Sequence, residues 1–280
     1  MPETKTIARD SAGTQWRSHA RSRRVRLADG RETTVHVATF PRHRTAVRVA
    51  VFPDAQRLVD WCKRTGTRHA LTGGFFSRRT GRPLGRVWMR GVAVETDPFG
   101  KQWADSRGAI HAVGGTVRIA PLHELPHYPV GDLVTAGPLL VREGRSLINE
   151  AHHFEGIPET WENELDDDWT RIRAQRTALG LDRSRIWAVA CDGPTTNAPA
   201  GGPGDTADEA GIDLAELAQL LLMLGAEEGL NLDGGGGTTL VHDQRLINRP
   251  RAGAHDEGYD VGEPMRTGRP IHTALTFLDK

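Results

Sequence analysis

Residues 230–241 read Leu230-Asn231-Leu232-Asp233-Gly234-Gly235-Gly236-Gly237-Thr238-Thr239-Leu240-Val241. Leucines alternate with polar residues at the start of this stretch, which predicts a short strand that ends near Asp233. The four glycines that follow have no side chains, so their backbone can bend tightly or be approached closely. We therefore expect a carboxylate beside unshielded N–H groups, an arrangement suited to a ligand that carries both a sugar and a phosphate.

Two familiar glycine-rich motifs fit this stretch poorly. A P-loop requires a Gly-Lys-Ser/Thr sequence that opens a helix, and no lysine is present here. A dinucleotide-binding fingerprint also requires a helix after the glycines. Residues 238–247 instead predict a hairpin that turns near Asp243 and Gln244. A simpler alternative is that the glycines only form a tight link between two strands.

Composition limits the class of protein. The 280 residues carry 36 basic and 36 acidic side chains, so no global charge favours nucleic acid or a membrane surface as a partner. Cys62 and Cys191 are the two cysteines, which excludes a disulfide scaffold and a cysteine-rich zinc site. The segment from Met1 to Arg31 contains no apolar stretch typical of a secretion signal, and no apolar run is long enough to span a bilayer. We therefore expect a cytoplasmic protein.

The chain is expected to form one large domain over residues 31–280, after a basic and partly disordered arm at residues 1–30. A helix is predicted at about residues 55–65, with Gly66 as its stop. The clearest helix signal is a capping box between Asp213 and Glu216, followed by an apolar stripe that ends before Gly225.

The two helices occur in similar contexts. Each precedes a short strand and then a glycine-rich segment, Gly73-Gly74 in the first case and Gly234–Gly237 in the second. This repeated order predicts an α+β fold with mixed or antiparallel sheets, in which two helix–strand–Gly-loop units converge on one cleft.

Residues 149–173 are acidic and aromatic, and we interpret them as a surface excursion that could cover the site. His152, His153 and several acidic residues in this segment could bind a metal ion. Adjacent histidines point in different directions on any regular element, however, which argues against such a site. No ligand spacing in the chain predicts a metal site, and no motif predicts a cofactor.

Several motifs occur together and in order, and together they resemble the phosphodiester glycosidase family over about residues 33–278. They are Gly73-Gly74-Phe75-Phe76, Ala136-Gly137-Pro138-Leu139-Leu140, Arg176-Thr177-Ala178-Leu179-Gly180, Asn231-Leu232-Asp233 with its glycines, and Asn248-Arg249-Pro250. The resemblance implies a mixed α+β fold. It also implies cleavage of the bond between the anomeric carbon of a sugar and a phosphodiester, with a small sugar phosphate as substrate. The family usually has Asn where this chain has Thr72, and commonly Ser where it has Gly237.

Glycoside hydrolysis generally uses two carboxyl groups, one as base or nucleophile and one as proton donor. The resemblance suggests Asp233 for the first role and Asp192 for the second. Arginine forks and backbone N–H groups would hold the phosphate. The residues expected to bind substrate are Gly73, Gly74, Phe75, Arg176, Asn231, Gly235, Gly236, Gly237, Thr238, Thr239, Asn248 and Arg249.

Two other functions remain open from the sequence. A non-catalytic glycan-binding or exopolysaccharide assembly protein could use the same scaffold. Nucleic-acid binding through the basic cluster between Arg21 and Arg26 is a poorer fit, because the overall charge is balanced.

Overall fold

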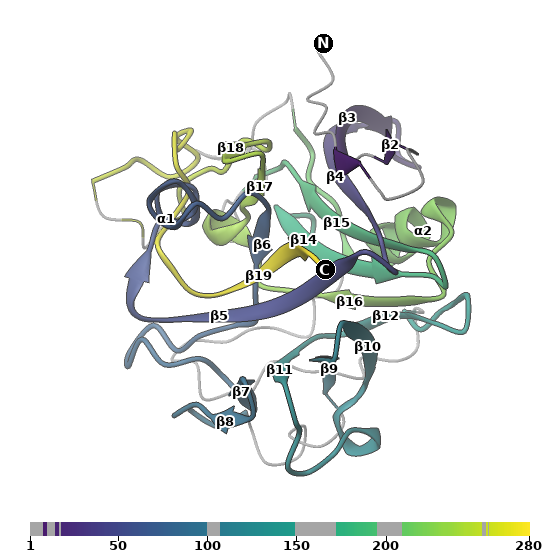
Figure 1. Ribbon diagram of the computed structural model, residues 1–280. Helices are drawn as coiled ribbons and strands as arrows, with labels where there is room; N and C mark the ends of the chain where they lie inside the picture. The colour runs from purple at the N-terminus through teal and green to yellow at the C-terminus, as the bar shows by residue number, and fades with distance from the viewer. Residues whose placement is uncertain are drawn as a thin grey trace.

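The computed structural model describes residues 18–99, 107–148, 172–194, 209–253, 256 and 258–280, together with the short backbone pair β1 (Ala8–Arg9) and β2 (Gln15–Trp16). Within this part of the chain, three antiparallel sheets and two α-helices form the fold (Figure 1). None of the helices in these residues is long and apolar enough to cross a membrane.

The first sheet has seven strands and carries the glycine-rich stretch at one end of its central strand. Its strands, in spatial order, are β13 (Arg145–Ser146), β12 (Leu139–Arg142), β16 (Glu228–Asn231), β14 (Arg176–Leu181), β15 (Arg185–Cys191), β4 (Glu32–Pro41) and β3 (His19–Arg26).

The second and third sheets have five strands each. The second contains β18 (Arg245–Leu246), β17 (Leu240–His242), β6 (Ala70–Thr72), β19 (Ile271–Asp279) and β5 (Thr45–Gln56). The third contains β10 (Thr116–Pro121), β9 (Gly108–Val113), β11 (Asp132–Ala136), β7 (Val87–Met89) and β8 (Val92–Ala93), and lies below the other two in Figure 1. A short 3₁₀ turn, η1 (Leu122–Glu124), follows β10.

All three sheets contribute to one central core. Phe40 and Leu179 enter it from the first sheet, Val49 and Leu275 from the second, and Ile110 from the third, and each is at most 5% exposed. The two helices cover other faces of the first two sheets and lie on opposite sides of the molecule (Figure 1). Helix α2 (Leu214–Leu224) packs on the first sheet, and α1 (Leu58–Thr65) packs on the second.

The antiparallel sheets and both helices were expected, but the α+β class was wrong, because the fold is mostly β. The helices have only 8 and 11 residues, so each covers part of one sheet and neither forms a layer of its own. The strand ladders are antiparallel throughout the described residues, and the one parallel contact is an isolated bridge between Leu84 and Asp97.

The predicted helix signals are confirmed in detail. Asp213 accepts a hydrogen bond from Glu216 N, and the Glu216 side chain accepts one from Asp213 N, which completes the capping box. Gly225 and Gly66 end the two helices at φ 94° and 74°. The first helix begins later than predicted, at Leu58, because strand β5 continues to Gln56.

The basic segment near the N-terminus was expected in a solvated arm, but residues 19–26 form strand β3. This strand pairs with β4 along its whole length, from His19 opposite Thr39 to Arg26 opposite Glu32. Its arginines lie on the exposed edge of the sheet, where charged side chains discourage pairing with another chain.

Two further expectations have different outcomes. The hairpin at Asp243 and Gln244 is confirmed, since both residues have positive φ and join β17 to β18. Gly137-Pro138 was expected at a bulge inside one strand, but it links β11 to β12, which belong to different sheets. The acidic segment proposed as a cover lies outside the described residues, except for residues 172 and 173.

Replacing Leu221 with alanine should lower the free energy of unfolding by about 2–5 kcal/mol. The reason is that this fully buried side chain joins α2 to the first sheet. Chemical denaturation would measure the loss. Met223→Ala on the same helix is a matched control, since Met223 is 77% exposed. A surface change of this kind should alter stability by less than about 0.5 kcal/mol. Equal effects of the two variants would contradict this packing.

Candidate active site

The two glycine-rich segments meet through backbone hydrogen bonds where β16 and β6 end. Asp233 N donates to Gly73 O at 3.0 Å, and the Thr72 hydroxyl donates to Gly237 O at 2.5 Å. The same Thr72 oxygen accepts from Thr239 N at 3.1 Å. Thr72, which stands where the family usually has Asn, therefore ties the second glycine segment to the end of β6.

Residues Gly235–Gly237 form a short 3₁₀ turn, η3. Its N–H groups were expected to face a phosphate, but several bind the backbone: Gly235 N donates to Gln175 O and Gly237 N to Gly234 O. At two of these glycines, side chains approach the backbone closely. A Cβ at position 236 would lie 2.7 Å from Asp256 Oδ2, and one at position 237 would lie 3.0 Å from both Arg269 Nη2 and Asp233 Oδ2.

Asp233 is a buried carboxylate with an incomplete set of partners. Its Oδ1 accepts from Gly234 N at 3.0 Å, while Oδ2 has no hydrogen bond within the described residues and lies 3.6 Å from Arg269 Nη2. Burial raises the pKa of the Asp233 carboxyl above its ordinary value, against the opposing effects of Arg269, the Gly234 N–H and Arg78. A carboxyl group in this state can exchange a proton closer to neutral pH than an exposed aspartate can.

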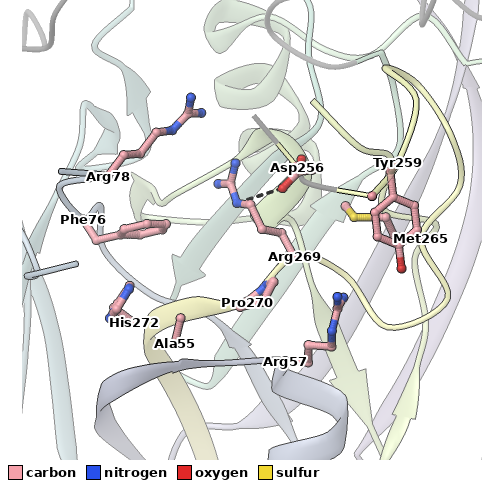
Figure 2. Close-up of a pocket in the computed structure, with 11 residues that line it drawn as sticks. Ala55, Arg57, Phe76, Arg78, Asp256, Tyr259, Met265, Arg269, Pro270 and His272 are labelled. Atoms are coloured by element: carbon pink, nitrogen blue, oxygen red, sulfur yellow. Dashed lines mark ion pairs between the residues drawn. The ribbon is translucent and has the colours of Figure 1, made fainter. Parts of the chain in front are cut away.

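An open cavity of about 800 Å³ is lined by Arg269, the residue whose Nη2 lies 3.6 Å from Asp233 Oδ2. Figure 2 shows Arg269 among the lining side chains, with Phe76 and Arg78 on one side and Tyr259 and Met265 on the other. The lining residues are Ala55, Arg57, Phe76, Arg78, Asp256, Gly258, Tyr259, Met265, Arg269, Pro270 and His272. Three guanidinium groups, from different parts of the chain, thus face one space.

Positive charge predominates in the cavity, because three arginines line it beside one acidic residue, Asp256. Arg269 Nε lies 3.9 Å from Asp256 Oδ1 (Figure 2), so this guanidinium interacts with Asp256 as well as with Asp233. Asp256 Oδ2 also accepts from Gly253 N at 2.6 Å. Burial lowers the pKa of Arg78, and repulsion from Arg269 adds to the effect. An anion placed between these two arginines would therefore be stabilised by both.

Two residues predicted to act on the substrate lie outside this cavity lining. The Asp192 carboxylate is buried and has partners on both oxygens, His36 Nε2 at 2.9 Å and Arg249 N at 2.8 Å. The Arg176 guanidinium is also buried and donates through Nη2 to Ile172 O at 2.8 Å. Burial lowers the pKa of Arg176 to about 10. Their contacts are those of residues that brace the end of the first sheet.

The remaining predicted residues mostly fix the loops around Asp233. Asn248 accepts from Leu240 N and donates to Thr238 O, each at 2.8 Å. Asn231 donates to Gly137 O at 2.8 Å, while its own side-chain oxygen has no partner within the described residues. The hydroxyls of Thr238 and Thr239 are likewise buried without a partner in that part of the chain.

Four more predicted residues occupy positions around the site without lining the cavity. A Cβ at Gly73 would lie 2.7 Å from Thr273 Oγ1, and one at Gly74 would lie 2.6 Å from Thr135 O. Phe75 is buried in the central core. The Arg249 side chain is exposed. The convergence of both glycine segments on one cleft therefore stays a prediction.

The sequence did not identify the residues that line the cavity. Phe76 and Arg78 follow the predicted Gly73-Gly74 segment, so only their proximity to that motif could have pointed to them. Asp256 and Arg269 lie in the irregular chain between β18 and β19, where no periodicity marks a functional position. A Gly-Arg-Pro sequence at residues 268–270, just before a strand, was the available signal.

Comparison with curated proteins finds relatives of one kind. N-acetylglucosamine-1-phosphodiester alpha-N-acetylglucosaminidase from Mus musculus is 30% identical over 212 residues, which cover 74% of this chain and 38% of the mouse protein. The enzyme of the same name from Bos taurus is 29% identical over 211 residues, covering 74% and 37%. The chain therefore spans less than two-fifths of the length of these relatives.

Solved structures show that the fold is shared as well. The zebrafish N-acetylglucosamine-1-phosphodiester alpha-N-acetylglucosaminidase catalytic domain, auto-inhibited by its pro-peptide, gives a TM-score of 0.69 at 19% identity and covers 100% of this chain and 89% of that chain. A hypothetical protein from Synechocystis gives 0.63 at 18% identity, covering 94% and 62%. The family model described as phosphodiester glycosidase matches residues 65–278. The chain thus belongs to the phosphodiester glycosidase family, as its motifs indicated.

Proposed function

We propose that this protein hydrolyses the glycosidic bond of a sugar-1-phosphodiester or nucleotide sugar, which releases the free sugar and a phosphomonoester. The observation that carries this proposal is the arrangement around Arg269, a residue of an arginine-lined cavity, whose guanidinium lies 3.6 Å from the buried Asp233 carboxylate and 3.9 Å from the cavity-lining Asp256 carboxylate. The curated relatives bear the name of an enzyme that acts on a sugar-1-phosphodiester, and the family match supports the same reaction class.

The arginines would hold the phosphodiester. A guanidinium offers a planar fork of donors that matches two phosphate oxygens. Arg78 and Arg269 are the best placed, because each lowers the cost of an anion between them and Arg269 already lies beside both carboxylates. Arg57 is partly committed, since its Nη1 donates to Gly268 O at 2.5 Å. The remaining length of the cavity would take the sugar and the group beyond the phosphate.

The carboxyl groups would carry out the bond exchange at the anomeric carbon. Asp233 acts as the base or nucleophile, and Asp256 takes the place that the sequence suggested for Asp192. Whichever route is followed, water supplies a hydroxyl to the anomeric carbon, and the bond from that carbon to the phosphate oxygen breaks. The phosphate is a good leaving group, so holding its charge contributes more than protonating it does.

The first test is product analysis with a panel of α- and β-linked sugar-1-phosphodiesters and nucleotide sugars. We expect free sugar plus an intact phosphomonoester, with heavy oxygen from labelled water in the sugar. Asp233→Asn should lower turnover by about 10²–10⁴-fold, because the carboxylate is lost. The variant should unfold no more easily than wild type at neutral pH, since burial already disfavours the charged form.

The raised pKa of Asp233 also makes the stability of the fold depend on pH. With a raised pKa in the folded state, Asp233 stabilises the fold below its ordinary titration range and loses that contribution as pH rises through the folded pKa. Any stability advantage of Asp233→Asn should therefore vanish in acid.

In the product analysis, heavy oxygen in the phosphate instead of the sugar would make the protein a phosphodiesterase, and an absence of turnover would favour glycan binding.

Asp256 and Asp192 can be separated by a matched pair of substitutions. Asp256→Asn should reduce kcat by about 10²-fold or more, because its carboxylate lines the cavity, and any loss of stability from its contacts with Gly253 N and Arg269 should be too small to account for the lost activity. Asp192→Asn should mainly lower stability, by roughly 1–3 kcal/mol, because it disturbs buried bonds to His36 and Arg249 N. The reverse pattern in activity and unfolding would restore Asp192 as the second carboxylate.

Arg78→Gln should lower kcat/KM for phosphodiester substrates by about 10–100-fold, since a charge-assisted bond to phosphate is removed. The same variant should change hydrolysis of a neutral aryl glycoside far less. Arg249→Gln is the matched control, because this side chain is exposed and outside the cavity lining. If both substrates lost activity equally in Arg78→Gln, the assignment of Arg78 to the phosphate would be wrong.

A further inference from the structure

A second group of polar side chains lies at the other end of β6 and β17, away from the glycine segments. Val241 pairs with Ala70 in the ladder between these strands, so His242 and His69 follow as cross-strand neighbours. Asp243 begins the hairpin turn after β17 and is separated from His69 by 174 residues. Because this separation is so large, no ligand spacing in the sequence could reveal the group.

The donor atoms of these three residues have the spacing of metal ligands. His69 Nε2 lies 3.8 Å from Asp243 Oδ1, and His242 Nδ1 lies 3.6 Å from Asp243 Oδ2. One ligand atom from each residue lies within 4.8 Å of the other two. A tetrahedral zinc ion with bonds of about 2.0–2.2 Å places its ligand atoms roughly 3.3–3.6 Å apart, so a small inward shift suffices.

We propose that His69, His242 and Asp243 form a divalent metal site of the zinc class, with water as the fourth ligand. Two imidazoles and one carboxylate are borderline ligands that suit Zn²⁺ better than the oxygen-seeking Mg²⁺ or Ca²⁺. One negative charge among the three ligands offsets part of the charge of the ion, and the partly exposed Asp243 leaves a path to solvent.

His242 supplies the strongest evidence for a missing partner. Its side chain is fully buried, and Nδ1 has no hydrogen bond within the described residues. Nε2 lies 3.3 Å from Ser18 Oγ, and in the tautomer that donates to this hydroxyl the lone pair of Nδ1, 3.6 Å from Asp243 Oδ2, is available to an ion.

Binding would require one local rearrangement. Asp243 N donates to His69 Nδ1 at 3.3 Å. This contact is longer than an ordinary hydrogen bond, and coordination through Nε2 would move the proton to Nδ1 and open it. Arg68 Nη2 lies 2.6 Å from Asp243 Oδ1 and holds the carboxylate in place. Ligating carboxylates are commonly held by such an outer hydrogen bond.

The site would connect to the catalytic region through the two short strands. The strands that begin and end at this group carry Thr72 and Thr239 at their other ends, and Thr72 N donates to Thr239 O at 3.0 Å. An ion here would therefore fix the relative position of the two segments that flank Asp233. Its role is structural, and it does not depend on the proposed hydrolase activity.

The test uses the full chain without an affinity tag, treated with a chelator and then titrated with Co²⁺ and, separately, Zn²⁺. We expect one ion per chain, the visible absorption of four-coordinate Co²⁺, and a rise in Tm of about 5 °C at a hundredfold excess over Kd. Asp243→Asn should abolish these signals. Asn tolerates the positive φ of 50° at this position, so the variant should fold.

The double variant His152→Gln/His153→Gln is the matched control, because it removes the other pair of histidines that the sequence offers. It should bind Co²⁺ with the same stoichiometry and spectrum as wild type. The proposal is overturned if wild type gives only a six-coordinate spectrum or no stoichiometric binding. It is also overturned if binding survives Asp243→Asn and disappears in the double variant.

Discussion

The arrangement of the site depends on one guanidinium that is paired with two carboxylates. Arg269 lies 3.6 Å from Asp233 and 3.9 Å from Asp256, and these acids reach it from different parts of the chain. Buried charges are costly unless they are paired, so each of the three side chains limits where the others can lie. The pairing is also loose, because neither contact has the length of a charge-assisted hydrogen bond. Because its ion pairs are long, Arg269 can still donate hydrogen bonds to an anion that enters the cavity.

This constraint explains the glycine-rich turn differently from the sequence argument. The stretch was expected to leave bare backbone for a substrate, yet at Gly236 and Gly237 the space is used by Asp256, Arg269 and Asp233. Since a Cβ at either position would come within 3.0 Å of one of these side chains, the glycines allow the charged cluster to form against the backbone. They serve the site by admitting its own charged groups.

The sequence predicted the parts of the structure that local patterns encode. The capping box at Asp213, the helix stops at Gly66 and Gly225, and the turn at Asp243 and Gln244 each depend on a few adjacent residues, and all are present. The proportion of helix and sheet was misjudged because short helices leave strong sequence signals, whereas edge strands such as β3 look like charged arms. For the proposed site, the sequence pointed to Asp233 and its loop but not to Arg269 or Asp256, whose segment has no regular pattern.

The contrast between Asp192 and Asp256 is the reason for proposing a second carboxylate other than the one that motif proximity suggested. Asp192 follows a strand beside β14, close to the glycine segment in the sheet, but His36 and Arg249 N satisfy both of its oxygens. Asp256 belongs to no recognised motif, yet it lines the cavity and shares Arg269 with Asp233. A carboxylate whose hydrogen bonds are completed by the protein holds loops in place. Asp233 has an oxygen without a hydrogen bond in the described residues, and Asp256 lines the cavity, so these two are the pair on which the proposed chemistry depends.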